Sequence, residues 1–208
     1  MNTSLMTSAE LTALLLLCTA MSFTPGPNNN LSTVLAANFG LKHAMRFVLS
    51  VALGWGLLLC LCTSGMGALV VSLPPLRWGI TACGVAYLLW MAWKLWHTHQ
   101  RGQASASQLD VTFRQGVMLQ FLNIKAWMLA LTVVAGWLAG REDIASRFAV
   151  VLPIMLLFGL TSNLTYALMG TLLRRWLADA EHGGRRLRWF NRSMAAVLAA
   201  TAAWMVRL

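Results

Sequence analysis

The chain has 208 residues, of which 58% are hydrophobic and only 11% are charged. A soluble domain carries roughly 25% charged residues, so the composition excludes an ordinary soluble protein. The net charge of +10 does not indicate nucleic-acid binding, because the basic residues stand between long apolar blocks, as topology signals of membrane proteins do.

The apolar blocks predict an all-α, polytopic membrane protein, because a helix of about 20 mainly apolar residues crosses the ~30 Å of hydrocarbon. Six transmembrane helices are predicted, at residues 9–38, 44–73, 78–96, 113–139, 144–173 and 192–207. The first is broken near mid-membrane, the second is stopped by Pro74 and Pro75, and the fifth carries a candidate kink at Pro153.

A polar stretch rich in Ser, Gln and Gly divides the chain near its midpoint and is typical of a flexible linker. It covers about residues 98–112 and separates a first repeat, about 8–97, from a second, about 113–208, within a single membrane domain spanning 1–208. Each repeat holds three predicted helices. An odd number of helices makes the two repeats insert in opposite directions, which predicts an inverted-repeat transporter.

Basic residues are divided unequally between the two sides of the predicted membrane domain. Eleven fall in or beside the first, third and fifth loops: Lys42, Arg46, Lys94, Arg101, Arg114, Arg174, Arg175, Arg185, Arg186, Arg188 and Arg192. Four fall on the other side: Arg77, Arg141, Arg147 and Arg207. Because basic loops stay in the cytoplasm, both termini are expected outside. The arginines at 185–192 are expected to contact anionic lipid head groups.

The cysteines and glycines of the predicted helices indicate packing rather than chemistry. Cys18, Cys60, Cys62 and Cys83 all fall inside predicted helices, without histidine or acidic neighbours, so neither a metal site nor a bound cofactor is expected. The pair Gly136 and Gly140 fits the spacing of close helix contacts.

The sharpest local feature is the run of residues 24–29, which reads Thr24, Pro25, Gly26, Pro27, Asn28 and Asn29. Two prolines and a glycine cannot continue an ordinary helix. Irregular backbone at membrane depth persists only where it is buried in protein or lines a wet cavity. The new helix start after the break would offer its amides and positive dipole end to a carboxylate. The alternative is a proline kink whose polar side chains bond to neighbouring helices.

A second polar feature occupies the equivalent place early in the second repeat. Lys125 is the only charged residue well inside a predicted span, and Asn123 precedes it by two positions. An intramembrane charge is a candidate functional residue, able to pair with a substrate carboxylate or with a carbonyl freed at the first break. The alternative is a lysine that snorkels to the cytoplasmic surface. In the fifth helix, the polar patch at 161–166 adds Asn163 as a further candidate or as a helix-to-helix bond.

The motif at residues 24–28 resembles the LysE/RhtB superfamily of bacterial amino-acid exporters, and the resemblance covers essentially the whole chain. The Asn123-Ile124-Lys125 segment, the length and the six-span pattern also fit. Residues 27–29 and 120–125 are most similar to the cysteine and O-acetylserine exporter branch. Many members have Asn-Pro-Lys where this chain has Ile124 in the middle, so the second break is expected to be milder than the first.

The resemblance implies efflux of small amino acids, driven by an ion gradient through exchange for protons. We expect alternating access, with a central site at the two breaks, in the bacterial inner membrane. No carboxylate falls deep in a predicted span, so the proton carrier is left open between Lys125, the substrate itself and Glu10. The sequence does not decide between a monomer and a homo-oligomer.

Two other functions are alternatives to the export of amino acids. A transporter or channel for another solute, such as a metal cation, would need coordinating acids, histidines or thiolates in its spans. A membrane-embedded enzyme is not expected, because the predicted spans hold no Ser/His pair, aspartate dyad or metal cluster.

Overall fold

The computed structural model describes residues 5–98, 111–177 and 184–207, and within these ranges all regular secondary structure is helical. The all-α prediction is therefore confirmed. The predicted linker falls almost wholly on residues 99–110, outside the described ranges. The helices are α1 (Ser8–Phe23), α2 (Pro27–Phe39), α3 (Leu41–Thr63), α4 (Met66–Ser72), α5 (Pro74–Trp96), α7 (Phe113–Leu122), α8 (Ile124–Val133), the π-helical turn η1 (Val134–Leu138), α9 (Ile144–Leu177) and α10 (Arg185–Met205).

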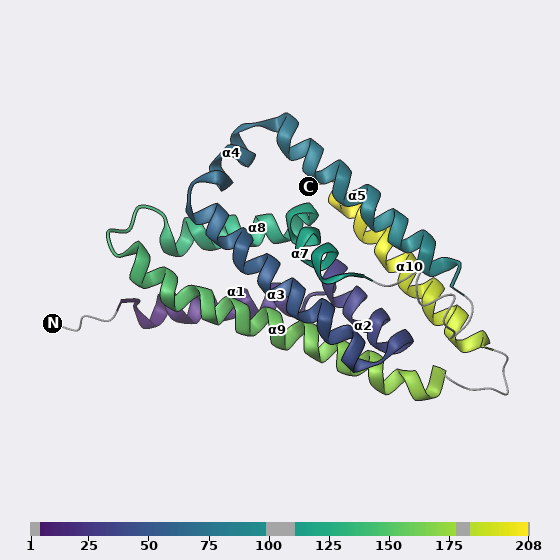
Figure 1. Cartoon of the computed structure of the whole chain (residues 1–208). Coiled ribbons are helices and arrows are strands. Elements are labelled where there is room, and N and C mark those ends of the chain that lie inside the picture. Colours follow the sequence, from purple (N-terminus) through teal and green to yellow (C-terminus); the bar gives the residue numbers. More distant parts are fainter. Residues whose placement is uncertain (1–4, 99–110, 178–183, 208) are drawn as a thin grey trace.

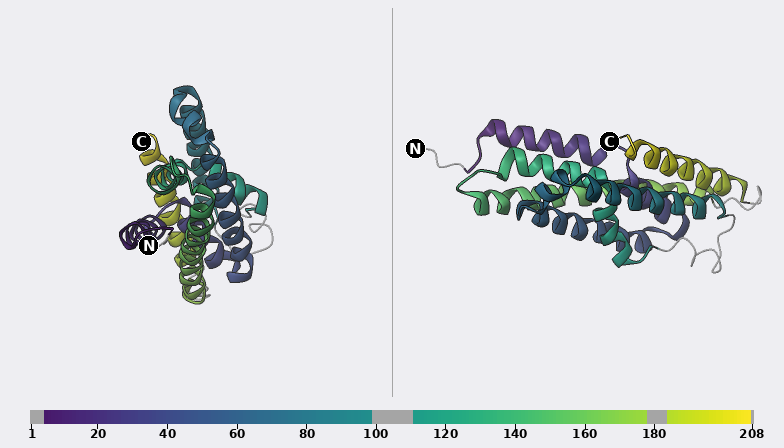
Figure 2. Two further views of the ribbon diagram at one scale, coloured as in Figure 1. Left: turned by 90° about the vertical axis from the view of Figure 1, so that its left-hand side faces the viewer. Right: turned by 90° about the horizontal axis from the view of Figure 1, so that it is seen from above.

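The helices form an elongated bundle around α2 (Figures 1 and 2). Helix α1 lies along α9, α5 and α10 run side by side, and α3 lies between these two pairs. Helix α2 packs against α9, α3 and α10, and 11 of its 13 residues are buried. By contrast, only Leu14 and Cys18 of α1 are buried. The short helix α2 is therefore the centre of the molecule and α1 is one of its outer layers.

Two helices, α3 and α9, are each long and apolar enough to cross a membrane. Three further candidate spans are bent pairs: α1 with α2, α4 with α5, and α7 with α8 and η1. Helix α10 is not among the candidates, because four arginines occupy its first eight positions and alanines fill much of the rest. Up to five spans are thus supported within the described residues, and the sixth is not.

The second and third predicted helices differ from the observed ones at their shared boundary. The chain turns at Gly65, which has φ +95°, and α3 ends at Thr63 instead of continuing to Leu73. Pro74 does not merely stop a helix but begins α5, because the first helical position needs no amide donor. The α4–α5 pair is bent by 96°. Pro153, the candidate kink, lies inside α9, which continues through it as one helix.

Close helix contacts depend on glycines other than the predicted pair. A Cβ at Gly170 would collide with the carbonyl oxygen of Thr33, and a Cβ at Gly84 would collide with that of Leu122. These glycines let α9 approach α2 and let α5 approach α7. Neither Gly136 nor Gly140 has a described neighbour within 4 Å of a built Cβ, so the prediction of packing there is wrong.

Candidate functional site

The first break separates α1 from α2 at residues 24–26 and bends the pair by 50°. Pro27 takes the first position of α2, where a missing amide costs nothing. Gly26 precedes it in an extended conformation, and Thr24 caps the end of α1. The prolines therefore end one helix and start the next within three residues, as the sequence predicts.

Side chains from three helices bind the carbonyl groups freed at the end of α1. The amide nitrogen Nδ2 of Asn29 donates to the carbonyl oxygens of Ser22, at 2.9 Å, and Thr24, at 3.1 Å. The ammonium nitrogen Nζ of Lys125 also donates to the Thr24 oxygen, at 3.1 Å. From α9, the hydroxyl of Tyr166 donates to the carbonyl oxygen of Phe23, at 3.0 Å. The negative dipole end of α1 is thus well supplied with donors.

The amide end of α2 is arranged differently, because no side chain of the described residues caps it. The side chain of Asn28 is instead paired with that of Gln120 on α7. Asn28 Nδ2 donates to Gln120 Oε1 at 2.9 Å, and Gln120 Nε2 donates back to Asn28 Oδ1 at 3.2 Å. The first backbone amides of α2 therefore keep their hydrogen-bonding capacity, and the positive dipole end of the helix faces the break.

The second break lies between α7 and α8 and bends that pair by 67°, more than the first break. The expectation of a milder second break is therefore wrong. At the second break Asn123, and not a proline, separates the two helices. It sits outside the helix, with φ −95° and ψ 99°, and its side-chain oxygen accepts the amide of Lys125 at 3.2 Å. Such an N-cap starts a new helix without proline.

The two breaks meet at two adjoining cavities. Five residues line both cavities: Thr24, Gly26, Pro27, Asn123 and Lys125. The first cavity extends between α3, α8 and α9, and the second extends toward the end of α10. The start of α2 and the start of α8 thus face the same space.

The nine residues that the sequence predicts for substrate binding all line these cavities. Besides the five shared residues, Asn28, Asn29 and Asn163 line the first cavity and Pro25 lines the second. The ammonium group of Lys125 does not extend to the cytoplasmic surface. It donates a hydrogen bond to a carbonyl oxygen of the first break.

Several residues of this region were not predicted as site residues. Gln120 is fully buried, and the contact with Asn28 depends on how α7 crosses α2. Trp55, from α3, lines the first cavity, and Thr201 and Trp204, from α10, line the second. Gln120 stood within a polar segment of the sequence, so a signal existed for it. Trp55 lies in an apolar helix and Thr201 and Trp204 lie in the alanine-rich end of α10, where nothing in the sequence separates a cavity wall from the rest of the helix.

Polar side chains along α2 form hydrogen bonds with helices of the second half. Ser32 donates to Asn163 Oδ1 on α9 at 2.9 Å. Asn38 and Asn191, on α10, form a second reciprocal amide pair, with distances of 3.0 and 3.3 Å. Both members of this pair are buried, and neither lines a cavity.

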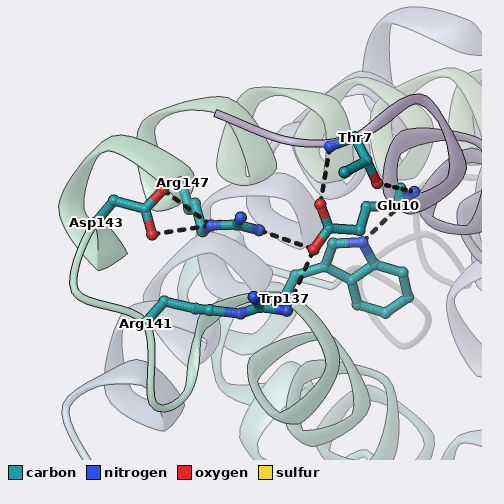
Figure 3. A network of polar contacts seen from close by, with 6 residues as sticks. All are labelled: Thr7, Glu10, Trp137, Arg141, Asp143 and Arg147. Atoms are coloured by element: carbon teal, nitrogen blue, oxygen red, sulfur yellow. Dashed lines mark hydrogen bonds and ion pairs between the residues drawn. The ribbon is translucent and has the colours of Figure 1, made fainter. Parts of the chain in front are cut away.

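An ion-pair network joins the start of α1 to the loop before α9 and the first turn of α9 (Figure 3). Glu10 Oε1 accepts from Arg141 and from Arg147, each at 3.2 Å, and Arg147 Nε contacts both carboxylate oxygens of Asp143 at 3.0 Å. The indole of Trp137 donates to the carbonyl oxygen of Glu10 at 2.9 Å. Glu10 is therefore engaged at one end of the molecule and does not line either cavity.

Comparisons with known proteins agree with the membrane character of the chain. The family model for LysE type translocators matches residues 19–207. The cysteine/O-acetylserine efflux protein of Salmonella choleraesuis (strain SC-B67) is 29% identical over 166 residues, which cover 80% of this chain and 83% of that protein. The protein of the same name from Escherichia coli (strain K12) is 28% identical over 159 residues, covering 76% and 80%. No solved structure gives a significant match.

Proposed function

The chain belongs to the LysE type translocator family, and from that premise we propose that it exports small neutral amino acids such as cysteine or O-acetylserine. The proposed location is the bacterial inner membrane. The proposed mechanism is alternating access with exchange for protons, and the substrate is bound at the two breaks. One observation carries the proposal: the starts of α2 and α8 and the end of α1 face shared cavities.

This arrangement suits the chemistry of an α-amino acid, whose ammonium and carboxylate groups stand on the same carbon. Such a ligand needs a negative and a positive pole side by side. The end of α1 provides carbonyl oxygens and a negative dipole end, and the start of α2, three residues later, provides amide donors and a positive one. The proposed carboxylate position is the start of α2, near Asn28 and Asn29, with Asn123 and the start of α8 opposite.

The walls of the first cavity support a small, partly apolar substrate. Away from the breaks it is lined by Met21, Leu129 and Met155, beside the indole of Trp55. A short thiol or acetyl-bearing side chain would find apolar contacts there, while the polar groups at the breaks would fix its orientation. The names of the two relatives described above favour the same class of substrate.

The proposed topology has six spans in two inverted repeats, both termini outside, and anionic lipid at the arginines that begin α10. The two breaks, one in each half, support the repeat, and the excess of basic residues in alternate loops supports the orientation. For the coupled proton, Glu10 is disfavoured because it is held by Arg141 and Arg147 away from the cavities. Lys125 and the substrate are then the remaining carriers.

Export of a metal cation is the second candidate and is disfavoured by the lining of the cavities. Among the residues that the structure describes, Lys125, a cation, is the only charged one that lines the cavities, and no carboxylate or histidine lines them. From the described lining residues, a metal cation would find carbonyl oxygens at the end of α1 but not the carboxylate, histidine or thiolate ligands that metal sites use, and it would be repelled by Lys125 and by the two helix starts.

Efflux from proteoliposomes tests the proposal. Vesicles loaded with labelled cysteine or O-acetylserine should release it faster with the protein than without it, and a protonophore should reduce uphill transport. Lys125→Ala should slow the efflux, whereas Lys94→Ala should not, because Lys94 lies over the ring of Trp90 at 3.6 Å and lines neither cavity. Transport unaffected by Lys125→Ala would place the site elsewhere.

A further inference from the structure

The ammonium of Lys125 occupies a specific position at the first break. Its Nζ lies 3.1 Å from the carbonyl oxygen of Thr24. A Cβ built on Gly26 would lie 3.3 Å from that nitrogen and 3.9 Å from the same oxygen. Because Gly26 has no side chain, the lysine reaches the space between the end of α1 and the start of α2.

This position is favourable for a cation on one side only. The carbonyl end of α1 attracts positive charge, but the starts of α2 and α8 repel it. Within the described parts of the chain, no carboxylate lines either cavity to balance the lysine. The hydrogen bond to Thr24 is therefore the principal contact holding the ammonium in place.

The Thr24 oxygen has no capacity for another strong donor. A carbonyl oxygen carries two lone pairs, and it already accepts from Asn29 Nδ2 and from Lys125 Nζ, both at 3.1 Å. Asn29 is 4% exposed, and its own side-chain oxygen accepts from Ser162. Lys125 is only half-buried, and its ammonium group is attached through a long, flexible side chain. A new donor at this oxygen would thus displace the lysine and not the asparagine.

We propose that the carbonyl oxygen of Thr24 is the subsite for the substrate's ammonium group, and that Lys125 fills this subsite while the protein is empty. The inference rests on the proposed function. The α-ammonium of an amino acid takes over the bond to Thr24, and the displaced lysine keeps its positive charge near the carboxylate. The subsite selects amines over hydroxy acids, because a hydroxyl group cannot replace a cation at the carbonyl end of a helix.

The two roles open to Lys125 predict opposite effects of removing its charge. If the lysine competes with the substrate's ammonium, Lys125→Met will tighten binding of an amine. If it pairs with the substrate's carboxylate, the same change will weaken binding of an acid and leave an amine unaffected. Cysteamine, which lacks the carboxylate of cysteine, and 3-mercaptopropionate, which lacks the ammonium, separate the two cases.

The experiment measures binding of both compounds and of cysteine by calorimetry with the purified full-length protein. We expect Lys125→Met to bind cysteamine roughly ten-fold more tightly than the wild type, which corresponds to about 1.4 kcal/mol, and 3-mercaptopropionate no more tightly. Lys125→Arg should not show the gain, since it retains a cation. Lys94→Met, the matched control, should bind all three compounds as the wild type does.

Cysteamine bound no more tightly by Lys125→Met would overturn the inference, while efflux by the wild type would leave the exporter proposal standing. If the wild type neither binds cysteine nor releases it from vesicles, the exporter proposal fails first. Lys125→Gln, neutral and polar, serves as the deciding variant if Lys125→Met does not fold, and the same gain with cysteamine is required of it.

Discussion

Two reciprocal amide pairs offer a matched test of where the substrate binds. Asn28 pairs with Gln120 at the edge of the first cavity, and Asn38 pairs with Asn191 outside both cavities. Replacing either Asn28 or Asn38 by alanine leaves the partner with one bond to a backbone carbonyl, at Gly116 or at Thr98. In each variant one buried amide oxygen loses its donor. The loss at the partner side chain is therefore alike. Asn38→Ala also removes a bond to the carbonyl oxygen of Val34, so it is the more damaging of the two changes, yet only Asn28 lines a cavity.

The expected loss of stability follows from this loss of a donor. A buried polar group without its partner costs about 1–3 kcal/mol, and Gln120 and Asn191 are both fully buried. For a chain of this size, each kcal/mol lowers the melting temperature by about 2–4 °C. Both Asn28→Ala and Asn38→Ala should thus melt roughly 2–12 °C below the wild type, as measured by thermal unfolding in detergent.

Transport should separate the two variants. Asn28→Ala should raise the KM for efflux at least about ten-fold, since a hydrogen bond to a charged ligand contributes about 1.5–3 kcal/mol. Asn38→Ala should leave the KM within about two-fold, a difference of roughly 0.4 kcal/mol. Equal changes in KM for the two variants would refute the reasoning, because the effect would then follow from lost stability and not from the cavity.

Three further predictions concern the packing, the second break and the ion-pair network, and the first and third of them have a matched control variant. Gly170→Ala should lower the free energy of unfolding by about 1–3 kcal/mol, because the new Cβ would clash with the carbonyl oxygen of Thr33. Gly79→Ala is the control: its Cβ would have no described neighbour within 4 Å, so the free energy of unfolding should rise by up to about 1 kcal/mol. Ile124→Pro should keep the helicity of α8, because the position is the first of that helix and Asn123 is already extended. The lost packing of the buried isoleucine side chain should cost about 0.5–1.5 kcal/mol. A large loss of helicity by circular dichroism would contradict this. Glu10→Gln should lower the melting temperature, because it removes the carboxylate that pairs with Arg141 and Arg147. Glu142→Gln, which changes a nearby exposed acid, should lower it less. Similar melting curves for the two variants would show that the ion pairs do not stabilise the protein.

The sequence predicted the first break because its cause is local. Pro25 and Pro27 lack amide donors wherever they stand, so the interruption needs no knowledge of neighbours. The second break has no such marker. Asn123 is a helix cap only if the chain turns there, and the turn depends on how α7 and α8 pack against α3. Ile124 suggested continuity, which the tertiary structure overrides.

The residues lining the cavities divide in the same way. Polar groups deep in an apolar chain are rare enough to be noticed, and all nine predicted residues line a cavity. Trp55 and Trp204 were not predicted, because an aromatic ring on a cavity wall and one facing lipid look the same in a sequence. The glycine contacts failed for a related reason. Spacing identified Gly136, but only the path of a neighbouring backbone distinguishes Gly170.

The composition of α2 explains why the site lies between the two halves of the chain. Six of the 13 residues of α2 are Asn, Ser or Thr. In lipid, each polar group of these side chains left without a hydrogen bond would cost several kcal/mol of free energy. Bonds to the second half relieve most of this cost, from Gln120 near the start of the helix to Asn191 near its end; the side-chain oxygen of Asn30 is the exception, with no partner among the described residues. The first half alone cannot bury these groups. The helix that begins at Pro27 is therefore stable in the membrane only when α7, α9 and α10 surround it, and the cavities at its start exist only once both halves have come together.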